Sequence, residues 1–325
     1  MDRLQRTLPL VLSIGLLLAT VAYAAPPREF EDPRTRDATF NPDPYADPSH
    51  DMGNPLRYIA SSTLAGISFG LVLLVAILQS LCTWKWGAKY MLAMVIGGYT
   101  FAIGLATRFA LNDNPRSKGT YIAMYLFVVL SPCAFIAATY VLLGRFARHL
   151  KCDELLLVSP RYITRIFITS DVVTFLVQAA GGGVSAGSTT VKMAKIGSRI
   201  FLAGLALQLL SYLIFITVYI TFLVRIRTRR PEVWNMDKEL GTKWFSRWKT
   251  LAGAFMLSCI GILVRSIFRT IELGEGYAGY LATHEVYFYT LDTLPLFIAI
   301  SIFVPFWPGR FIREESSVVE NCGGG

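Results

Sequence analysis

Charged residues are scarce in this chain, and their scarcity excludes an ordinary soluble fold. Only 16% of the 325 residues are Asp, Glu, Lys or Arg, whereas 54% are hydrophobic. Because a soluble domain carries about 25% charged residues, too little polar surface remains to cover a chain of this length in water. The composition therefore predicts an integral membrane protein.

Motifs for catalysis and for metal binding are absent as well. The sequence has no GxSxG, Walker or HExxH motif, and its five cysteines form no CxxC pair and no Cys/His spacing suited to zinc. A metal hydrolase that uses Asp171, His284 and Asp292 stays a minor alternative, because zinc sites usually gather several imidazoles. We expect no cofactor, no metal and no enzymatic activity.

The first 25 residues have the pattern of a signal peptide. Two arginines precede an apolar core over 8–21, and an A-x-A cleavage site follows at 22–24. An uncleaved first helix is the alternative. The next segment, 26–57, is rich in Pro, Asp and Arg and cannot bury a core. We expect it to be extracellular and extended.

Seven apolar stretches follow, each close to the ~20 residues that a helix needs to cross about 30 Å of hydrocarbon. They cover 58–82, 90–111, 120–144, 166–187, 196–224, 250–272 and 286–307. The sequence therefore predicts an all-α, polytopic bundle of seven transmembrane helices over 58–309. A short cytoplasmic tail is expected over 310–325.

Basic residues lie mainly in the loops after the first, third and fifth stretches and in the tail. This distribution predicts that the N-terminus is outside and the C-terminus inside. It also accounts for the net charge of +9 without nucleic acid. Five tryptophans near the predicted inner helix ends are interpreted as interfacial anchors: Trp84, Trp86, Trp244, Trp248 and Trp307.

Charged residues inside the sixth and seventh stretches are the most informative feature. Arg265, Arg269 and Glu272 share one helix face, and Glu285 and Asp292 share another. Since the two stretches run in opposite directions, Arg265 and Asp292 both lie about 10 Å below the outer helix ends. We expect a buried polar cluster there. It is either a site for a polar or cationic headgroup or a set of ion pairs that lock helices together.

A second polar stripe lies in the fourth stretch. Asp171, Thr174 and Gln178 recur at helical spacing, and the fifth stretch adds Gln208 and Tyr212, which could line a pathway with them. A helix this polar must face protein or water. For Asp171 we favour a pathway through the bundle, because a carboxylate is costly to bury. For Gln208 we favour an interhelical hydrogen bond.

Other local signals are weaker. A GxxxG pattern over Gly66–Gly70 would let the first helix pack closely. Pro132 and Pro295 lie inside the third and seventh stretches and should kink them. His284 is expected to be a solvated loop residue at the outer rim.

Three blocks of the sequence resemble the fungal lipid-translocating exporters, a family that includes sphingoid-base exporters and aminocholesterol-resistance proteins. They run over 131–145, 160–183 and 265–309. The second block is the most specific, with Pro160-Arg161, RIFITSDV over 165–172 and QAAGGG over 178–183. The resemblance implies seven spans and a role in lipid efflux, translocation or resistance to toxic amphiphiles.

One position departs from the family pattern. Phe101 stands where the family usually has an acidic residue, whereas Arg108 at the end of that helix is kept. The resemblance implies that Arg108 takes part in substrate binding. The altered position suggests that the substrate differs from that of relatives.

Together these features predict a transporter that exports or flips an amphiphile, such as a sphingoid long-chain base or a sterol-like compound, in the plasma membrane. A seven-helix receptor with a cytoplasmic partner is the alternative. The expected partners are membrane lipids and the amphiphile itself. The predicted substrate-binding and translocation residues are Asp171, Gln178, Arg265, Arg269, Glu272, Glu285, Asp292 and Arg108.

Overall fold

The computed structural model describes residues 43–46, 48, 51, 54–157, 159–188, 190–239, 248–276 and 279–312. These residues form helices and connecting turns, with no strand among them. The predicted signal peptide over 1–25 lies outside the described residues, as do most of 26–57 and residues 313–325.

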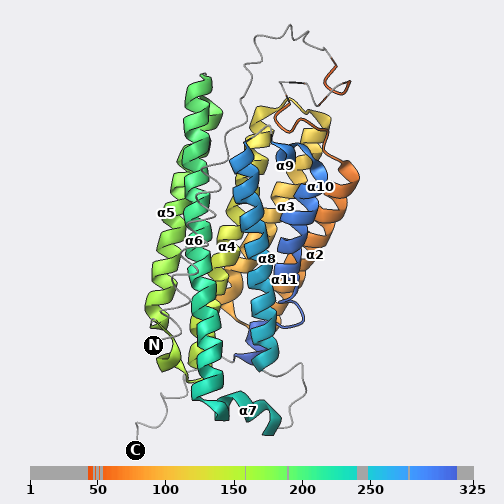
Figure 1. Ribbon diagram of the computed structural model, residues 1–325. Helices are drawn as coiled ribbons and strands as arrows, with labels where there is room; N and C mark the ends of the chain where they lie inside the picture. Colours follow the sequence, from red (N-terminus) through yellow and green to blue (C-terminus); the bar gives the residue numbers. More distant parts are fainter. Residues whose placement is uncertain are drawn as a thin grey trace, which may run out of the picture.

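Within the part of the chain that the structure describes, six helices are long and apolar enough to cross a membrane. They pack side by side as a bundle (Figure 1), which confirms the prediction of an all-helical, multi-pass membrane protein. Their bounds extend most of the predicted stretches by a few residues at one or both ends: α2 Ser62–Trp86, α3 Leu92–Asp113, α4 Lys118–His149, α5 Pro160–Gly187, α6 Val191–Arg229 and α8 Trp248–Glu275.

The seventh predicted stretch is helical but interrupted. It consists of α10 Glu285–Tyr287, a π-helix over Phe288–Thr293 and α11 Leu294–Ser301, which follow one another without a gap. Pro295 lies in the first turn of α11, where its missing N–H is tolerated. Single π-turns within helices often mark functional sites in proteins.

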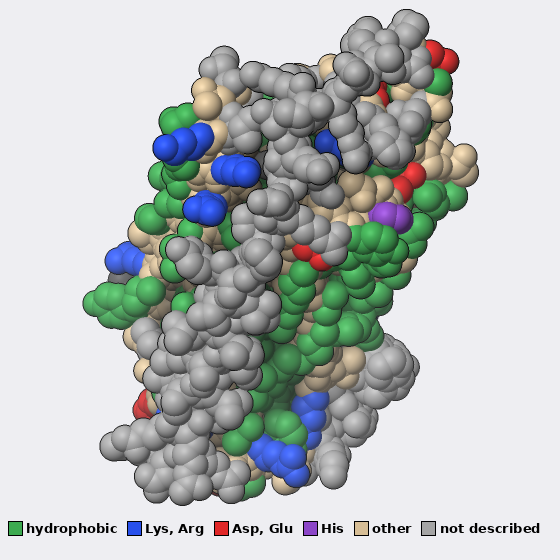
Figure 2. All heavy atoms as spheres, turned by 45° about the horizontal axis from the view of Figure 1, so that its top comes forward, with side chains coloured by type: hydrophobic (Ala, Val, Ile, Leu, Met, Phe, Trp, Pro, Cys, Tyr) green, Lys and Arg blue, Asp and Glu red, His purple; other side chains and the backbone are tan. Residues whose placement is uncertain are grey.

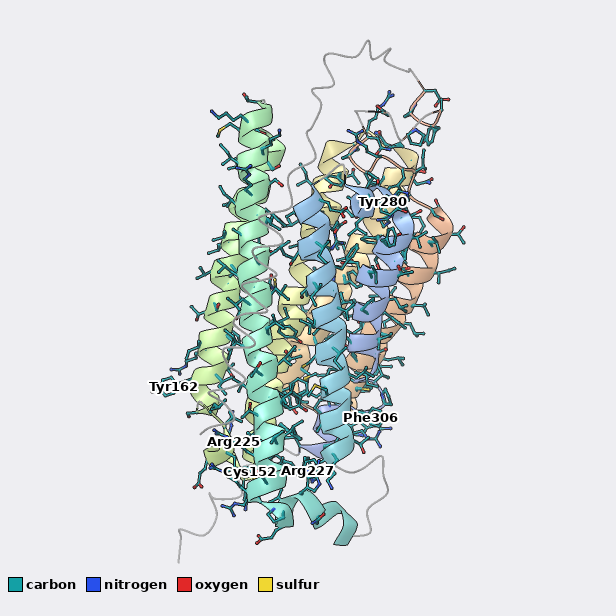
Figure 3. All side chains as sticks on the ribbon, viewed as in Figure 1. Cys152, Tyr162, Arg225, Arg227, Tyr280 and Phe306 are labelled. Carbon is teal, nitrogen blue, oxygen red and sulfur yellow. The ribbon has the colours of Figure 1, made fainter. Side chains whose placement is uncertain are left out.

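Short elements cap the two ends of the bundle. Figure 3 shows Tyr280 at one end and Cys152, Arg225 and Arg227 at the other; we call these the Tyr280 end and the Cys152 end. The Tyr280 end carries α9 Tyr280–Thr283. The Cys152 end carries the 3-10 helices η2 Lys89–Met91 and η3 Asp153–Leu155, with α7 Pro231–Glu239 and α12 Pro308–Phe311.

The tryptophans at the Cys152 end divide into two groups. Trp84 is 87% exposed, as an interfacial anchor would be. Trp248 and Trp307 are buried, and the Trp307 indole N–H donates to the Gly87 carbonyl over 3.2 Å. The anchor prediction is therefore wrong for these two, which pack into the protein core, and Trp244 lies outside the described residues.

Glycines bring α5 and α6 into close contact. A Cβ at Gly181 would lie 2.4 Å from a backbone nitrogen of α6, and one at Gly197 would lie 2.4 Å from a backbone nitrogen of α5. Such an approach requires residues without side chains. At Gly70, in the GxxxG pattern of α2, a Cβ would meet nothing within 4 Å, so the close packing predicted there is wrong.

The outward faces of the bundle suit a lipid environment. Large apolar side chains are exposed on α2 and α5, among them Ile67, Leu74, Val173 and Leu176. Figure 2 shows hydrophobic side chains over the middle of one face, with Lys and Arg side chains toward its upper left and lower edge. This arrangement matches a helix bundle that is solvated by hydrocarbon around its middle.

Candidate functional site

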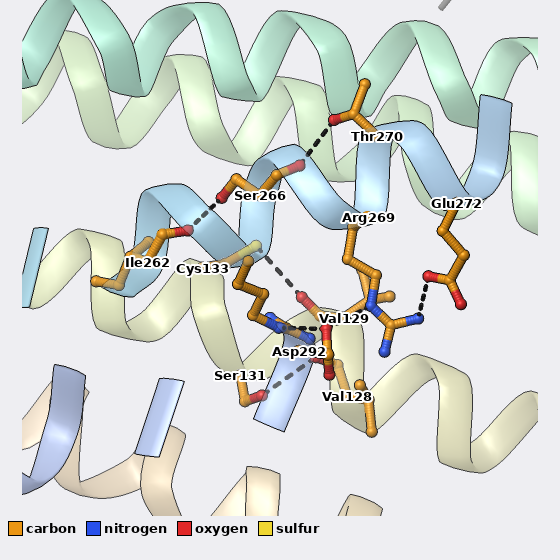
Figure 4. Close-up of polar contacts among 11 residues, drawn as sticks. Val128, Val129, Ser131, Cys133, Ile262, Ser266, Arg269, Thr270, Glu272 and Asp292 are labelled. Atoms are coloured by element: carbon orange, nitrogen blue, oxygen red, sulfur yellow. Dashed lines mark hydrogen bonds and ion pairs between the residues drawn. The ribbon is translucent and has the colours of Figure 1, made fainter. Parts of the chain in front are cut away.

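Two arginines of α8 meet one carboxylate of the π-helix at the predicted depth. The Nε atoms of Arg265 and Arg269 lie 2.7 and 2.6 Å from Oδ1 of Asp292, which is fully buried. Arg269 also reaches Glu272, with Nη1 2.9 Å from Oε2 (Figure 4). The predicted meeting of Arg265 and Asp292 is thus confirmed.

A backbone carbonyl of α4, left free by a proline, is a further partner for this cluster. Pro132 has no N–H, so the carbonyl four residues earlier, at Val128, lacks its helical hydrogen bond. Nη2 of Arg265 donates to that carbonyl over 2.7 Å. The hydrogen bond that α4 lacks at Val128 is therefore replaced by one from an arginine of α8.

Arg108 of α3 forms a second ion pair closer to the Tyr280 end. Its Nη2 lies 2.8 Å from Oε1 of Glu285, and it also donates to the Tyr58 hydroxyl over 3.1 Å. Its guanidinium carbon lies 4.2 Å from the centre of the Phe288 ring, a cation–π distance. Glu285 additionally accepts from the N–H of Ser61, the N-cap of α2, over 2.9 Å.

The positive and negative charges of these two groups of ion pairs are equal in number. The set holds three arginines and three carboxylates: Arg108, Arg265, Arg269, Glu272, Glu285 and Asp292. Phe101, where the family resemblance expects an acidic residue, is fully buried with its ring centre 5.9 Å from the Arg265 guanidinium. An aromatic ring therefore stands where a fourth carboxylate would make the set negative. We call these six residues the neutral cluster.

Two small cavities adjoin the neutral cluster. The first, of ≈ 40 Å³, is lined at the Tyr280 end by Arg108, Arg269 and Glu272. The second, of ≈ 30 Å³, is lined by Arg265, Arg269 and Gln208. Tyr125 and Arg269 line both, so they separate the two spaces. Since one water needs roughly 10–15 Å³ by this measure, each cavity has room for a few waters and a headgroup would have to widen it.

Gln208 links the second cavity to the polar stripe of α5. Nε2 of Gln178 donates to Oε1 of Gln208 over 2.8 Å, and Nε2 of Gln208 donates to Sγ of Cys133 over 3.4 Å. The interhelical bond predicted for Gln208 is confirmed. Asp171, Thr174 and Gln178 are all at least 95% buried, so the polar stripe of α5 faces inward as predicted.

Asp171 differs from the other buried carboxylates. Among the described residues no cation forms an ion pair with its oxygens, and the polar group that interacts with it is the uncharged Tyr140 hydroxyl. It lies about 16 Å along the helix axis from Pro160, the first residue of α5, at 1.5 Å per residue. Asp171 is thus an uncompensated acid deep in the bundle.

A cluster of aromatic rings packs inside the bundle on the Cys152 side of Asp171. The Tyr140 ring centre lies 5.1 Å from that of Phe167 and 4.5 Å from that of Phe215. Phe215 continues to Phe255 at 6.4 Å, and Phe255 to Tyr219 at 4.4 Å. We call this set of rings the aromatic plug.

The structure brings the predicted residues into two groups. The neutral cluster contains six of them. Among the described residues, Gln178 is joined to the second cavity by Gln208, whereas Asp171 interacts with Cys133, which also interacts with Arg265. His284 is exposed and contacts the Tyr280 carbonyl over 2.8 Å, as expected for a loop histidine. Within the described residues, no group of three or more His, Cys, Asp or Glu side chains is placed to hold a metal.

Several contacting residues had no role in the sequence prediction. Tyr58, Ser61, Tyr125, Val128 and Tyr140 all touch or separate the charged groups. For Val128 a signal existed, because the proline four residues later frees its carbonyl. For the others, only the packing of distant segments shows the contact.

Comparison with known proteins agrees with the motifs in the sequence. A family model described as "RTA1 like protein" matches residues 94–315. Protein RTM1 of Saccharomyces cerevisiae is 32% identical over 220 residues, which cover 68% of this chain and 67% of that protein. Protoporphyrin uptake protein 1 of the same yeast is 32% identical over 223 residues, 68% of each chain.

A third relative extends the aligned region. The sphingoid long-chain base transporter RSB1 of Saccharomyces cerevisiae is 27% identical over 284 residues, which cover 78% of this chain and 72% of that protein. No solved structure matches the chain. The family match spans more than half of the sequence, and the chain therefore belongs to the RTA1-like family, the fungal lipid-translocating exporters that its motifs resemble.

Proposed function

We propose that this protein moves amphiphilic lipids with a cationic headgroup across the membrane and thereby confers resistance to them. A sphingoid long-chain base is the favoured substrate class, and a sterol-like amphiphile is the alternative. Relatives named as a sphingoid long-chain base transporter and as a protoporphyrin uptake protein support transport of amphiphiles. The protein acts as a transporter and not as an enzyme.

The observation that most directly supports this proposal is the chain of polar groups inside the bundle. It begins at the first cavity beside Glu272, passes Arg269 and Gln208, and reaches Asp171 by way of Cys133. A headgroup that follows this chain stays among polar side chains, while its alkyl tail remains in lipid. Such burial of polar groups at membrane depth is costly unless they serve a function.

The structure also favours one acceptor for the headgroup. Asp292 and Glu285 were candidates, but each already pairs with an arginine. Asp171 has no such partner among the described residues. An ammonium group at Asp171 would form the ion pair that this carboxylate lacks.

A topology completes the proposal. The seven predicted stretches span the membrane, with the Tyr280 end outside and the Cys152 end in the cytoplasm. Basic residues at the Cys152 end support this orientation, among them the exposed Arg227, Arg229 and Arg230. The plasma membrane, reached through the secretory pathway, is the proposed location.

Flux in proteoliposomes tests the function. Purified protein is reconstituted, and movement of a fluorescent sphingoid base between leaflets is followed for the wild type, Asp171→Asn and Asp153→Asn. Asp153 is an exposed carboxylate at the Cys152 end, so its variant controls for loss of one charge. We expect Asp171→Asn to slow flux by at least about tenfold, the equivalent of ~1.4 kcal/mol, while the control matches the wild type.

Two results would contradict the proposal. Absence of flux above protein-free vesicles would argue for the receptor alternative, since a receptor produces no difference in lipid accumulation. Unchanged flux in Asp171→Asn would remove Asp171 from the headgroup site.

A further inference from the structure

Asp171 lacks a compensating cation, and this has a consequence for how transport is driven. We propose that Asp171 holds either a proton or the ammonium group of the substrate, so that each amphiphile is exchanged for one proton. This inference rests on the proposed function and deepens it, because it names the second ligand of the same carboxylate.

The first argument is the cost of burying charge. Asp171 is 95% buried, and among the described residues no cation pairs with its carboxylate, whose polar neighbour is the uncharged Tyr140 hydroxyl. An ionised carboxylate in that position costs several kcal/mol, and such groups bind a proton instead. Asp292, although fully buried, accepts from two arginines and has no need of a proton. Without substrate, Asp171 is therefore the neutral acid.

The second argument is the absence of a competing base around it. Helices α4 and α6 pack against α5. From α4, the titratable groups facing Asp171 are Tyr140 and Cys133. From α6, the nearby groups are the uncharged Ser211, which interacts with Tyr140, and the phenol of Tyr212.

On α5 itself, the nearest basic residue toward the Cys152 end is exposed and remote. Arg165 lies six residues before Asp171, about 9 Å along the axis. Thr174 and Gln178, on the other side, are uncharged. Among the described residues, nothing near Asp171 supplies a positive charge, so only a proton or an incoming cation can neutralise it.

The exchange balances without any covalent change to the lipid. When R–NH₃⁺ reaches the protonated Asp171, the carboxyl proton leaves to water and the ammonium pairs with the carboxylate. When the amine leaves on the other side, the carboxylate takes a proton from that side. One proton thus moves opposite to each amine, and a proton gradient across the membrane is the energy source.

Proton release on binding tests this exchange directly. Dodecylamine is titrated into purified full-length protein in neutral detergent micelles, in weakly buffered solution with a pH indicator. Its amine resembles that of Lys, with a pKa of about 10, so near pH 6 it is fully charged and releases nothing itself. Binding is measured in parallel by calorimetry. N-acetylated dodecylamine is the uncharged control ligand.

Three proteins separate the outcomes. For the wild type we expect about one proton released per bound amine, falling toward zero as the pH is raised and the free carboxyl ionises. For Asp171→Asn we expect no release and at least about tenfold weaker amine binding, a loss of ~1.4 kcal/mol. Asp153→Asn should match the wild type. Because asparagine mimics the protonated acid in size and charge, Asp171→Asn should fold normally.

Failure of the proton exchange and failure of the proposed transport function give different results. Amine binding to the wild type without proton release overturns the exchange but leaves lipid transport standing. Equal proton release in Asp171→Asn assigns the proton to another group and also overturns the inference. Lack of amine binding, together with normal lipid flux in the proteoliposome assay, shows that the transported lipid is not held by its charge.

Discussion

Replacing Asp292 by asparagine should destabilise the protein strongly. The carboxylate is fully buried, and its Oδ1 accepts from Arg265 and Arg269 over 2.7 and 2.6 Å. The neutral cluster would then hold three arginines and two carboxylates. Removing one partner from a buried ion pair costs about 3–5 kcal/mol, mostly because the remaining charge stays buried. At about 2 °C per kcal/mol for a large domain, the melting temperature should fall by roughly 6–10 °C.

A double-mutant cycle tests the reason for this loss. Asp292→Asn combined with Arg265→Gln restores equal numbers of arginines and carboxylates, so the double variant should be more stable than the sum of the single effects predicts, by roughly 1–3 kcal/mol. The assay is thermal unfolding of purified protein in one detergent, followed by tryptophan fluorescence. Asp153→Asn, an exposed change of the same chemistry, should shift stability by less than ~0.5 kcal/mol. Strictly additive effects, or a wild-type melting temperature for Asp292→Asn, would refute the argument from charge balance.

Three further changes probe other contacts. Gly197→Ala places a Cβ 2.4 Å from a backbone nitrogen of α5 and should cost about 1–3 kcal/mol in unfolding assays, whereas Gly183→Ala meets nothing within 4 Å and should be neutral or stabilising. Arg108→Gln leaves Glu285 without its ion-pair partner; adding Glu285→Gln should recover part of the lost thermal stability, and no recovery would show that the pair is not coupled. Pro132→Ala introduces an N–H that competes with an arginine for the same carbonyl, so flux should change more than expression does; unchanged flux would separate the contact between Arg265 and the Val128 carbonyl from transport.

Part of this site follows from the sequence by simple geometry. The meeting of Arg265 and Asp292 required only the helical rise and the opposite directions of two predicted spans. The inward orientation of Asp171 required only the cost of placing a carboxylate in lipid. Both arguments use only the position and the chemistry of residues along single helices, which the sequence specifies well.

Contacts between distant segments required the structure. Glu285 pairs with Arg108, which lies 177 residues away along the chain, and no periodicity relates the two positions. Trp307 packs against the turn at Gly87 instead of the membrane interface, because that turn exposes a carbonyl to it. In both cases tertiary packing decides the partner.

The equal numbers of arginines and carboxylates in the neutral cluster have a consequence for the membrane potential. Moving one elementary charge across the full membrane costs about 2.3 kcal/mol per 100 mV, but a set with no net charge feels no net force along that field. A movement that carries all six residues of the neutral cluster together would therefore have the same free energy in a polarised and a depolarised cell. Asp292→Asn would add one uncompensated positive charge and make the same motion voltage-dependent.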